Sequence, residues 1–434
     1  MKVKTRLEKQ LHNFEIFKDQ LNYIYKNNKI YKNKLKSSNI MPSDIKSIND
    51  IAKLPLTTKQ DFFIDYPYGF YSVSKEKIVR FHSSSGSTGK SLIVGFTQKD
   101  IELRNKMVMD NCIKSGITKD DVVQICVGYG MFTGGLGYHE GLSSLGCTII
   151  PVSCGNTEKQ LFYIQTLNTT VLITSPSYAM HLYEISQKLG IDLKKTKLRM
   201  IKVGSELLTE KMRRLLKKSF GNNIVINQDY GMTETMGPGL GNECICCNGM
   251  HIYDKNFIYE LIDPITKEPT DDIIGELVIT TLNNECFPLI RYATNDIVVL
   301  DESKCSCGNK SVKIKKIIGR ADDMIKIKGV KIYISQVEDF ILKHNFCSSN
   351  YEIILTTNEY IDNIKIRIEY NSKLNFNEKI VLKKQIILEN EFKNTFGIKA
   401  DIELLENKTI TRKIGKVKRI KDLRNKNLVK NAII

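Results

Sequence analysis

The stretch "HSSSGSTGKS", residues 82–91, combines glycine, hydroxyl side chains and one lysine, the composition of a phosphate-binding loop. It is not a P-loop of the G-x-x-x-x-G-K-[ST] type, because Ser84 stands where that pattern needs its first glycine. A P-loop also opens a helix, whereas the "SLIVGFT" that follows is typical of a strand, as is the preceding "KIVRFHS". The sequence therefore predicts a hairpin whose connecting loop binds an anion, with Lys90 reaching a phosphate.

Beyond this loop, apolar strands alternate with helices up to about residue 250. Such alternation predicts parallel sheets with crossover helices, that is, an α/β fold. The glycine-rich "YGMFTGGLGYHEG" is expected to be a turn between a strand and the next element. We expect a large N-terminal domain over residues 1–318, in which 250–318 form a β-rich subdomain. Residues 319–434 are expected to form a small α+β lobe.

The chain of 434 residues carries a formal charge of +17 at pH 7. An excess of positive charge suggests acidic partners, although a solvated cationic surface is the favoured explanation. The lysines are spread along the chain, without the arginine and aromatic clusters of a groove for single-stranded nucleic acid. We therefore expect a small-molecule or protein partner, and no nucleic acid.

The cysteines and the N-terminus indicate a reducing compartment. Eleven cysteines in 434 residues do not form the dense pattern of a disulfide framework, and "MKVKTRLEKQLHNFEIF" is not a signal peptide. We expect a cytoplasmic location. No apolar run approaches the roughly 20 residues that cross a bilayer, so we expect no membrane partner.

Six motifs occur in a characteristic order: "SSSGSTGKS", "GSE", "DYGMTE", "RYATND", "GRADDMIKIKGV" and "GKVKR". Together they resemble the core motifs of the adenylate-forming superfamily. The stretches "YGMFTGGLGYH", "GCTIIPVSCGNTE" and "NECICCNGMHI" look like the phenylacetate–coenzyme A ligase branch. The resemblance runs from about residue 50 to the end of the chain. It implies that an aromatic or arylacetic acid is activated by ATP as an acyl adenylate and then transferred to a thiol.

The resemblance also implies an ATP and Mg²⁺ site. Tyr230 would stack on adenine, Asp296 would bind the ribose hydroxyls, and Glu234 would bind Mg²⁺. The plainer alternatives are a turn residue for Asp296 and a carboxylate at a helix N-terminus for Glu234. The full set implied for ATP or AMP is Ser84, Ser85, Gly86, Ser87, Thr88, Gly89, Lys90, Ser205, Glu206, Asp229, Tyr230, Gly231, Met232, Thr233, Asp296 and Arg320.

The resemblance also implies that the C-terminal lobe moves between the two half-reactions, and two of its residues are involved. Lys416 matches the catalytic lysine that bridges the acid and the α-phosphate, and Asp322 lies in the segment that resembles the hinge. The lobe would bring Lys416 to the site for adenylation and remove it for thioester formation. The sequence departs from the family in "RYATND", where Asn295 takes a glycine position. Because asparagine tolerates positive φ, we expect Asp296 to keep its orientation.

The acid and the thiol acceptor are less sharply indicated. Tyr129 and Phe132 would wall a pocket for a flat aromatic acid, although plain core packing is the alternative. The acceptor is coenzyme A, or alternatively the phosphopantetheine arm of an acidic carrier protein. A homodimer is left open.

A second site is indicated by two cysteine-rich turns. Cys244, His251, Cys305 and Cys307 are expected to bind a structural Zn²⁺, because four such ligands suit a closed tetrahedral site. The spacing to His251 is similar to that of zinc-bearing relatives of the phenylacetate ligases. Cys247 is the alternative to His251, and reduced, half-buried cysteines without metal are the plain alternative.

Overall fold

The structure, a computed structural model, describes residues 5–84, 91–321, 325–327, 330–358, 361–371, 378–411 and 419–424. The chain divides into two compact units. The first comprises Met1–Leu208 and Leu216–Ile317, and the second comprises Thr209–Leu215 and Ile318–Ile434.

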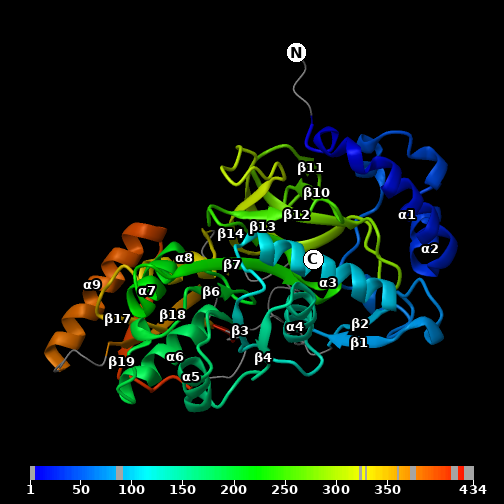
Figure 1. Ribbon diagram of the computed structural model, residues 1–434. Coiled ribbons are helices and arrows are strands. Elements are labelled where there is room, and N and C mark those ends of the chain that lie inside the picture. Colours follow the sequence, from blue (N-terminus) through cyan, green and yellow to red (C-terminus); the bar gives the residue numbers. More distant parts are fainter. Residues whose placement is uncertain are drawn as a thin grey trace. The chain divides into compact units, whose positions relative to one another are not determined.

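Twelve strands among the described residues form one continuous sheet (Figure 1). Their order across the sheet is β11 (Pro269–Thr270), β10 (Phe257–Ile262), β12 (Ile274–Thr281), β13 (Tyr292–Asp301), β14 (Lys313–Arg320), β9 (Met250–Ile252), β8 (Gly237–Glu243), β7 (Val225–Met232), β6 (Met200–Val203), β5 (Val171–Thr174), β3 (Val122–Ile125) and β4 (Thr148–Ile150).

Strand β7 joins two different halves of this sheet. It pairs in parallel with β6, and it pairs in antiparallel fashion with β8. On the β6 side, β5, β3 and β4 continue the parallel half, and β5 is buried along its whole length. On the β8 side the strands are largely antiparallel, and several are longer than those of the parallel half, such as β13 with 10 residues. The change of pattern near residue 250 therefore corresponds to the antiparallel half of one sheet.

Helices connect the parallel strands, as the alternation predicts. These are α4 (Thr133–Leu145), α5 (Thr157–Thr166), α6 (Pro176–Lys188) and α7 (Glu210–Phe220). The prediction of a turn over 129–141 is wrong beyond Phe132, because α4 begins at Thr133. Its glycines are needed for close packing. A Cβ at Gly137 would lie 3.0 Å from Pro238, and one at Gly141 would lie 2.7 Å from Val108.

The predicted hairpin around residues 82–91 is confirmed by the pairing of β1 (Arg80–Ser83) with β2 (Ile93–Phe96), in which Ser83 faces Ile93. Helix α3 (Gln98–Lys114) follows directly and packs on α4 and β8. Thr97 caps α3, since its hydroxyl accepts a hydrogen bond from the Asp100 amide at 3.2 Å. The hairpin is thus attached to a long, well-capped helix.

The N-terminal segment packs on the antiparallel half of the sheet (Figure 1). Helices α1 (Phe14–Asn27) and α2 (Lys29–Ser37) follow the 3₁₀ helix η1 (Glu8–Asn13). The Gln10 side-chain Nε2 donates to the Tyr259 backbone carbonyl at 2.9 Å, and the Gln20 side-chain Nε2 donates to the Asn284 backbone carbonyl at 2.6 Å. Further 3₁₀ turns are η2 (Pro42–Asp44), η3 (Ile48–Lys53), η4 (Asp61–Phe63), η5 (Lys75–Lys77), η6 (Leu193–Lys195) and η7 (Thr233–Thr235).

The second unit is built on a four-stranded sheet in the order β19 (Asp401–Leu405), β18 (Ile361–Tyr370), β17 (Cys347–Asn358) and β20 (Ile420–Asp422). It also holds the pair β15 (Ile325–Ile327) and β16 (Val330–Ile332), with helices α8 (Ile334–Ile341) and α9 (Glu378–Phe396). Phe340 of α8 and Phe392 of α9 pack edge to face at 5.3 Å in its core. This unit has its own apolar centre and is an α+β fold.

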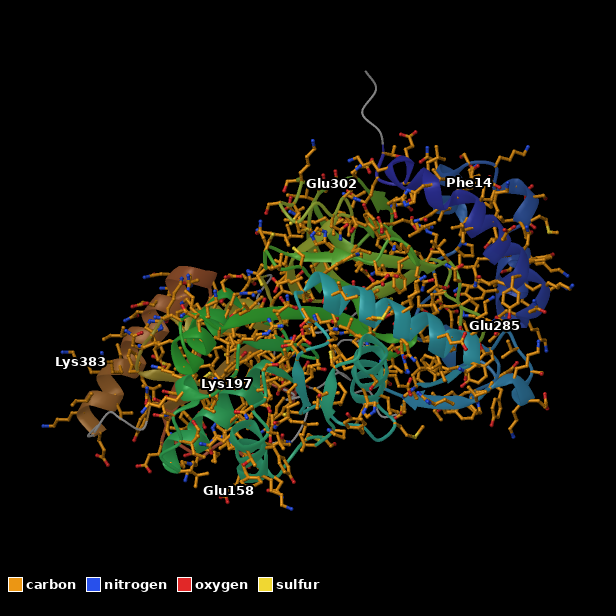
Figure 2. The ribbon with its side chains drawn as sticks, viewed as in Figure 1. Phe14, Glu158, Lys197, Glu285, Glu302 and Lys383 are labelled. Atoms are coloured by element: carbon orange, nitrogen blue, oxygen red, sulfur yellow. The ribbon has the colours of Figure 1, made fainter. Side chains whose placement is uncertain are left out.

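Charged side chains such as Glu158, Lys197 and Glu302 are exposed at the periphery of the first unit (Figure 2). Within the described part of the chain, no helix is both long and apolar enough to span a membrane.

Candidate active site

The phosphate loop begins at the end of the β1–β2 hairpin. The Ser84 amide donates to the Leu92 carbonyl at 2.9 Å, and the Leu92 amide donates to the Ser84 hydroxyl at 3.0 Å. Ser84 and Leu92 therefore hold the two ends of the loop together. The remaining loop residues predicted to contact phosphate lie outside the described residues: Ser85, Gly86, Ser87, Thr88, Gly89 and Lys90.

Ser205 and Glu206 follow the carboxyl end of β6. Ser205 is exposed and adopts a φ of 67°. The Glu206 carboxylate accepts two hydrogen bonds from Ser177, from its hydroxyl at 2.8 Å and from its amide at 3.2 Å. Ser177 lies in the first turn of α6, so the turn after β6 is fixed to a helix N-terminus, where a carboxylate is favoured.

Asp229 directs its carboxylate into a buried polar network. It accepts hydrogen bonds from the Tyr138 hydroxyl at 2.9 Å and the Gly239 amide at 3.0 Å. The Lys202 ammonium lies 3.5 Å away, and its side chain is 0% exposed. Burial raises the pKa of Asp229, and Lys202 opposes that shift. The Asp229 side chain thus links β7 to α4, β8 and β6, a structural role that the motif alone did not suggest.

Lys202 is a residue that the sequence reasoning missed. Its ammonium donates to the Asn227 side chain at 2.8 Å and also to the Asn242 side chain. A lysine in the otherwise apolar strand "LRMIKVG" was the available signal, because lysine is almost never fully buried without partners.

Tyr230 and Asp296 meet across the sheet. The Tyr230 hydroxyl donates to the Asp296 carboxylate at 2.5 Å, and both side chains are buried to more than nine-tenths. The expected positive φ of Asn295 is confirmed, at 63°. Gly231 follows Tyr230 at a point where a Cβ would lie 2.0 Å from the Gly237 carbonyl oxygen, so only glycine fits there. The bend leaves Met232 and Thr233 half-buried.

Glu234 lies in η7, directly after β7, and is held by Tyr292. The Tyr292 hydroxyl donates to Glu234 Oε1 at 2.7 Å. Tyr292 and Asp296 both belong to the "RYATND" motif. The motif therefore provides the contact to Glu234 in addition to Asp296 itself. Tyr292 was not predicted from the sequence, because its partner Glu234 lies 58 positions earlier in the chain.

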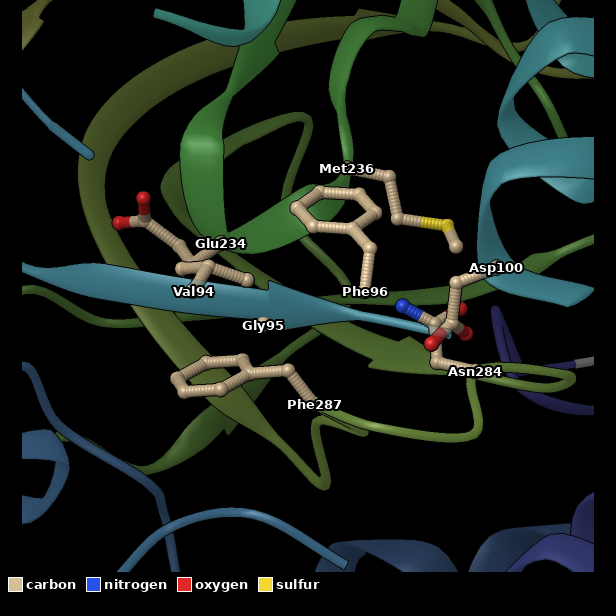
Figure 3. Close-up of a pocket in the computed structure, with 8 residues that line it drawn as sticks. All are labelled: Val94, Gly95, Phe96, Asp100, Glu234, Met236, Asn284 and Phe287. Atoms are coloured by element: carbon tan, nitrogen blue, oxygen red, sulfur yellow. The ribbon is translucent and has the colours of Figure 1, made fainter. Parts of the chain in front are cut away.

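A small cavity lies beside Glu234, but its chemistry does not suit phosphates. Asp100 and Glu234 lie at opposite ends of it, and the middle is largely apolar (Figure 3). Burial raises the pKa of Asp100, whose carboxylate accepts from the Glu285 amide at 2.7 Å and the Cys286 amide at 3.0 Å. The lining residues are Val94, Gly95, Phe96, Asp100, Glu234, Met236, Asn284 and Phe287. This cavity is a packing feature of the core.

The two residues expected to wall the acid pocket differ in their surroundings. Phe132 is exposed at the start of α4, where a Cβ on Gly128 would lie 3.3 Å from its ring. Tyr129 is half-buried against the core, and its hydroxyl lies 3.2 Å from His139 Nδ1. Burial raises the pKa of Tyr129. Phe132 is therefore the more accessible of the two.

The residues predicted in the C-terminal lobe are described only in part. Arg320 ends β14 and is half-buried. Asp322 and Lys416 lie outside the described residues.

Cys244, His251, Cys305 and Cys307 converge, and their ligand atoms all lie within 4.8 Å of one another. Cys244 Sγ lies 3.6 Å from Cys305 Sγ, and Cys307 Sγ lies 3.5 Å from His251 Nε2. Two ligands of a tetrahedral zinc ion lie roughly 3.7 Å apart, so these separations fit such an ion. His251 Nδ1 donates to the Ser311 carbonyl at 3.0 Å, which leaves Nε2 free to bind a metal.

Cys247, the alternative ligand, is not part of this group. It follows Cys244 in a tight turn with a φ of 48°, and its sulfur lies 3.9 Å from the Asn227 side-chain nitrogen. The strand pairing that places His251 opposite Lys313 brings the two cysteine-rich turns together.

Comparison with known proteins identifies the broad class of enzyme and then the family within it. Residues 32–282 match the family model of the AMP-binding enzymes, and residues 329–424 match that of the AMP-binding enzyme C-terminal domain. A phenylacetate–coenzyme A ligase of Aromatoleum evansii is 37% identical, over 95% of this chain and 94% of that protein. One of Pseudomonas putida is 36% identical, over 95% and 94%. The chain therefore belongs to the phenylacetate–coenzyme A ligase family of AMP-binding enzymes.

The fold agrees with this assignment. The crystal structure of a 2-hydroxyisobutyryl-CoA ligase in its postadenylation state, in complex with an acyl-AMP, superposes with a TM-score of 0.89 at 18% identity. The match covers 98% of this chain and 91% of that one. The α/β fold with a large AMP-binding domain and a small C-terminal domain is confirmed.

Proposed function

We propose that this protein activates an aromatic or arylacetic acid with ATP and transfers the acyl group to coenzyme A. The observation that carries the proposal is the gathering of four side chains at the carboxyl end of β7. Tyr230 contacts Asp296, and Tyr292 contacts Glu234, in a chain 37% identical to a phenylacetate–coenzyme A ligase.

The nucleotide would bind where β7 ends. The Tyr230 ring offers a face for adenine, and the Asp296 carboxylate offers acceptors for the ribose hydroxyls. The hydrogen bond between them fixes both before the nucleotide arrives, which lowers the cost of ordering them on binding. Ser84 to Lys90 would surround the β- and γ-phosphates.

Glu234 is the proposed Mg²⁺ ligand. Mg²⁺ prefers oxygen ligands and is usually bound through one or two carboxylates together with phosphate oxygens. Glu234 fits this requirement, because Tyr292 holds its carboxylate by a hydrogen bond directly after β7, where the nucleotide is proposed to bind. When bound, the ion would neutralise charge on the phosphates.

In the first half-reaction, an oxygen of the acid attacks the α-phosphorus of ATP. The bond to the β-phosphate oxygen breaks, and pyrophosphate leaves. Lys416 would bridge the acid and the α-phosphate, and Arg320 would contact the ribose. In the second half-reaction, the coenzyme A thiol loses its proton, its sulfur attacks the acyl carbonyl, and AMP leaves. The lobe formed by residues 319–434 would turn about Asp322 between the two.

The cysteine and histidine group is proposed to hold one structural Zn²⁺. Three thiolates and an oriented imidazole nitrogen form a closed set, which suits a structural ion. The ion would join the turn after β8 to the turn before β14. It takes no part in the chemistry.

The test is a pyrophosphate-release assay with ATP, Mg²⁺ and a panel of aromatic, arylacetic and amino acids, run with and without coenzyme A. We expect release with an aromatic or arylacetic acid, and an acyl–coenzyme A product when coenzyme A is present. Acyl adenylate that accumulates until a phosphopantetheinylated carrier protein is added would favour the carrier-protein alternative. No acid-dependent release from the folded protein would refute the adenylation itself.

A further inference from the structure

His82, directly before the phosphate loop, is fully buried with a polar partner at each ring nitrogen. Its Nδ1 lies 3.2 Å from the Met131 carbonyl oxygen, and its Nε2 lies 3.3 Å from the Arg104 guanidinium. A carbonyl only accepts hydrogen bonds, and a guanidinium only donates them. The proton of a neutral ring is therefore on Nδ1. Burial, with Arg104 adding to it, lowers the pKa of His82 to about 4, so the ring is neutral at physiological pH.

Arg104 is itself held rigidly, so that His82 has a fixed partner. The Arg104 side chain is 0% exposed and pairs with the Glu140 carboxylate of α4. Arg80, two residues before His82 on β1, pairs with the same carboxylate at 2.7 Å. The Phe96 ring packs edge to face on His82, with centroids 4.9 Å apart. Strand β1 and helices α3 and α4 are thus joined at one point.

The other partner of His82 belongs to the turn that precedes α4. The Met131 carbonyl accepts from the Ser83 amide at 2.8 Å as well as from His82 Nδ1. Met131 stands next to Phe132, in the turn proposed to wall the acid pocket. Two consecutive residues directly before the phosphate loop, His82 and Ser83, therefore both donate hydrogen bonds to the Met131 carbonyl. We call the turn over residues 129–132 that contains this carbonyl the acid-binding turn.

We infer that His82 is a positioning residue, which fixes the acid-binding turn relative to the phosphate loop and so aligns the acid with the α-phosphate. This inference rests on the proposed function. Attack on phosphorus needs the carboxylate and the α-phosphate in a near-attack arrangement, and a displacement of about 1 Å costs roughly 100-fold in rate. Thioester formation from a preformed acyl adenylate does not need that alignment.

Two substitutions separate the two bonds of His82. His82→Asn places an amide N–H near the position of Nδ1, so it keeps the donor to Met131 and loses the acceptor for Arg104. His82→Gln places an amide oxygen near the position of Nε2, so it keeps the acceptor and loses the donor. The measurements are KM and kcat for acid-dependent pyrophosphate release, thioester formation from synthetic acyl adenylate, and thermal stability.

We expect His82→Gln to lose at least about tenfold in kcat/KM for the acid, and His82→Asn to lose less than about threefold. Both variants should use the synthetic acyl adenylate at the wild-type rate. Equal losses in the two variants, or losses that follow thermal stability, would overturn the inference.

Amide hydrogen exchange at Ser83 distinguishes failure of this inference from failure of the proposed function. Exchange should quicken in His82→Gln but not in His82→Asn, whatever the enzyme activates. A wild-type protein that releases no pyrophosphate with any acid would refute the proposed function. Equal exchange at Ser83 in both variants would refute the role of His82.

Discussion

At the scale of single residues, Tyr292 shows how a buried hydroxyl can hold the carboxylate of the proposed Mg²⁺ ligand, Glu234. Tyr292→Phe removes the donor to Glu234 while keeping the ring that packs against Phe62. Hydrogen bonds to charged groups are worth about 1.5–3 kcal/mol, so we expect a loss of roughly tenfold or more in kcat/KM for MgATP. Steady-state kinetics over a range of Mg²⁺ concentrations measures it.

Tyr253→Phe is the matched control for that change. Tyr253 also donates its hydroxyl to a carboxylate, that of Asp110 at 2.8 Å, but it is not among the residues proposed to bind substrate. The control should leave kcat/KM for MgATP within about twofold of wild type. If both variants lose activity equally, Tyr292 acts through general stability and not through Glu234.

His82 also predicts a dependence of stability on pH. Its pKa is about 4 in the folded protein and about 6.5 in an unfolded chain, so between these values the unfolded state binds more protons. The stability that neutral His82 contributes is complete above about pH 6.5 and is lost as pH falls toward 4.

We therefore expect the stability difference between wild type and His82→Asn to shrink on acidification, by up to about 1.4 kcal/mol per pH unit. Urea unfolding of both proteins at pH 7 and pH 5 measures the difference. Parallel pH profiles would contradict the assignment of a neutral, buried ring.

Which residues could be predicted from sequence depended on whether their signal was local. The positive φ at Asn295 followed from the glycine that it replaces, and the structure confirms it. The contacts of Lys202 and Tyr138 with Asp229 join segments far apart in the chain, so no local pattern reveals them.

At the scale of elements, α4 is held by glycines that ordinary helix propensity disfavours. A Cβ at Gly141 would lie 2.7 Å from the Val108 side chain and 3.2 Å from the Asn105 backbone carbonyl oxygen. The branched Val108 side chain and the helical backbone of α3 leave little room to adjust. Gly141→Ala should therefore destabilise the protein by about 1–3 kcal/mol through overpacking, although alanine favours helix by up to about 1 kcal/mol.

Gly134→Ala, in the same helix, is the control. A Cβ there finds its nearest neighbour, Val127, at an ordinary 3.9 Å. This variant should be neutral or more stable by as much as about 1 kcal/mol in chemical unfolding. Equal effects of the two changes would mean that packing does not explain the glycines of α4.

The cysteine-rich turns give a second prediction at this scale. Protein purified without added metal should contain about one zinc per chain by elemental analysis. Cys305→Ser should lose the zinc and lower the thermal midpoint, because a ligand of the group is removed. Cys246→Ser should keep both, since Cys246 is exposed and contacts Ser306 outside the group. Metal-free wild-type protein of undiminished stability would rule out the zinc site.

The same contrast between local and distant signals holds for elements. The β1–β2 hairpin could be predicted because two β-rich stretches flank one loop. Helix α4 was missed because Gly135, Gly137 and Gly141 indicate a turn when they are considered locally. Their reason is tertiary, since each makes room for a neighbour that comes from elsewhere in the chain or from the preceding turn.

At the scale of the whole molecule, a single substitution should impair one half-reaction and leave the other unchanged. Lys416→Ala should slow adenylation by about 100-fold or more. It should not change thioester formation from synthetic acyl adenylate and coenzyme A, because Lys416 is proposed to contact only the α-phosphate. Lys418→Ala, two residues away, should affect neither reaction by more than about twofold. Equal loss of both half-reactions in Lys416→Ala would contradict this division between the two units.

The contact between Tyr230 and Asp296 has a consequence for synthesis on the ribosome. The two residues are 66 positions apart, so at roughly 5–20 residues per second the strand that carries Tyr230 emerges about 3–13 s before its partner. A nascent chain that stalls before residue 296 of 434 has most of its mass but lacks Asp296, the residue proposed to bind the ribose. Truncated translation products that lack Asp296 should therefore be inert toward ATP.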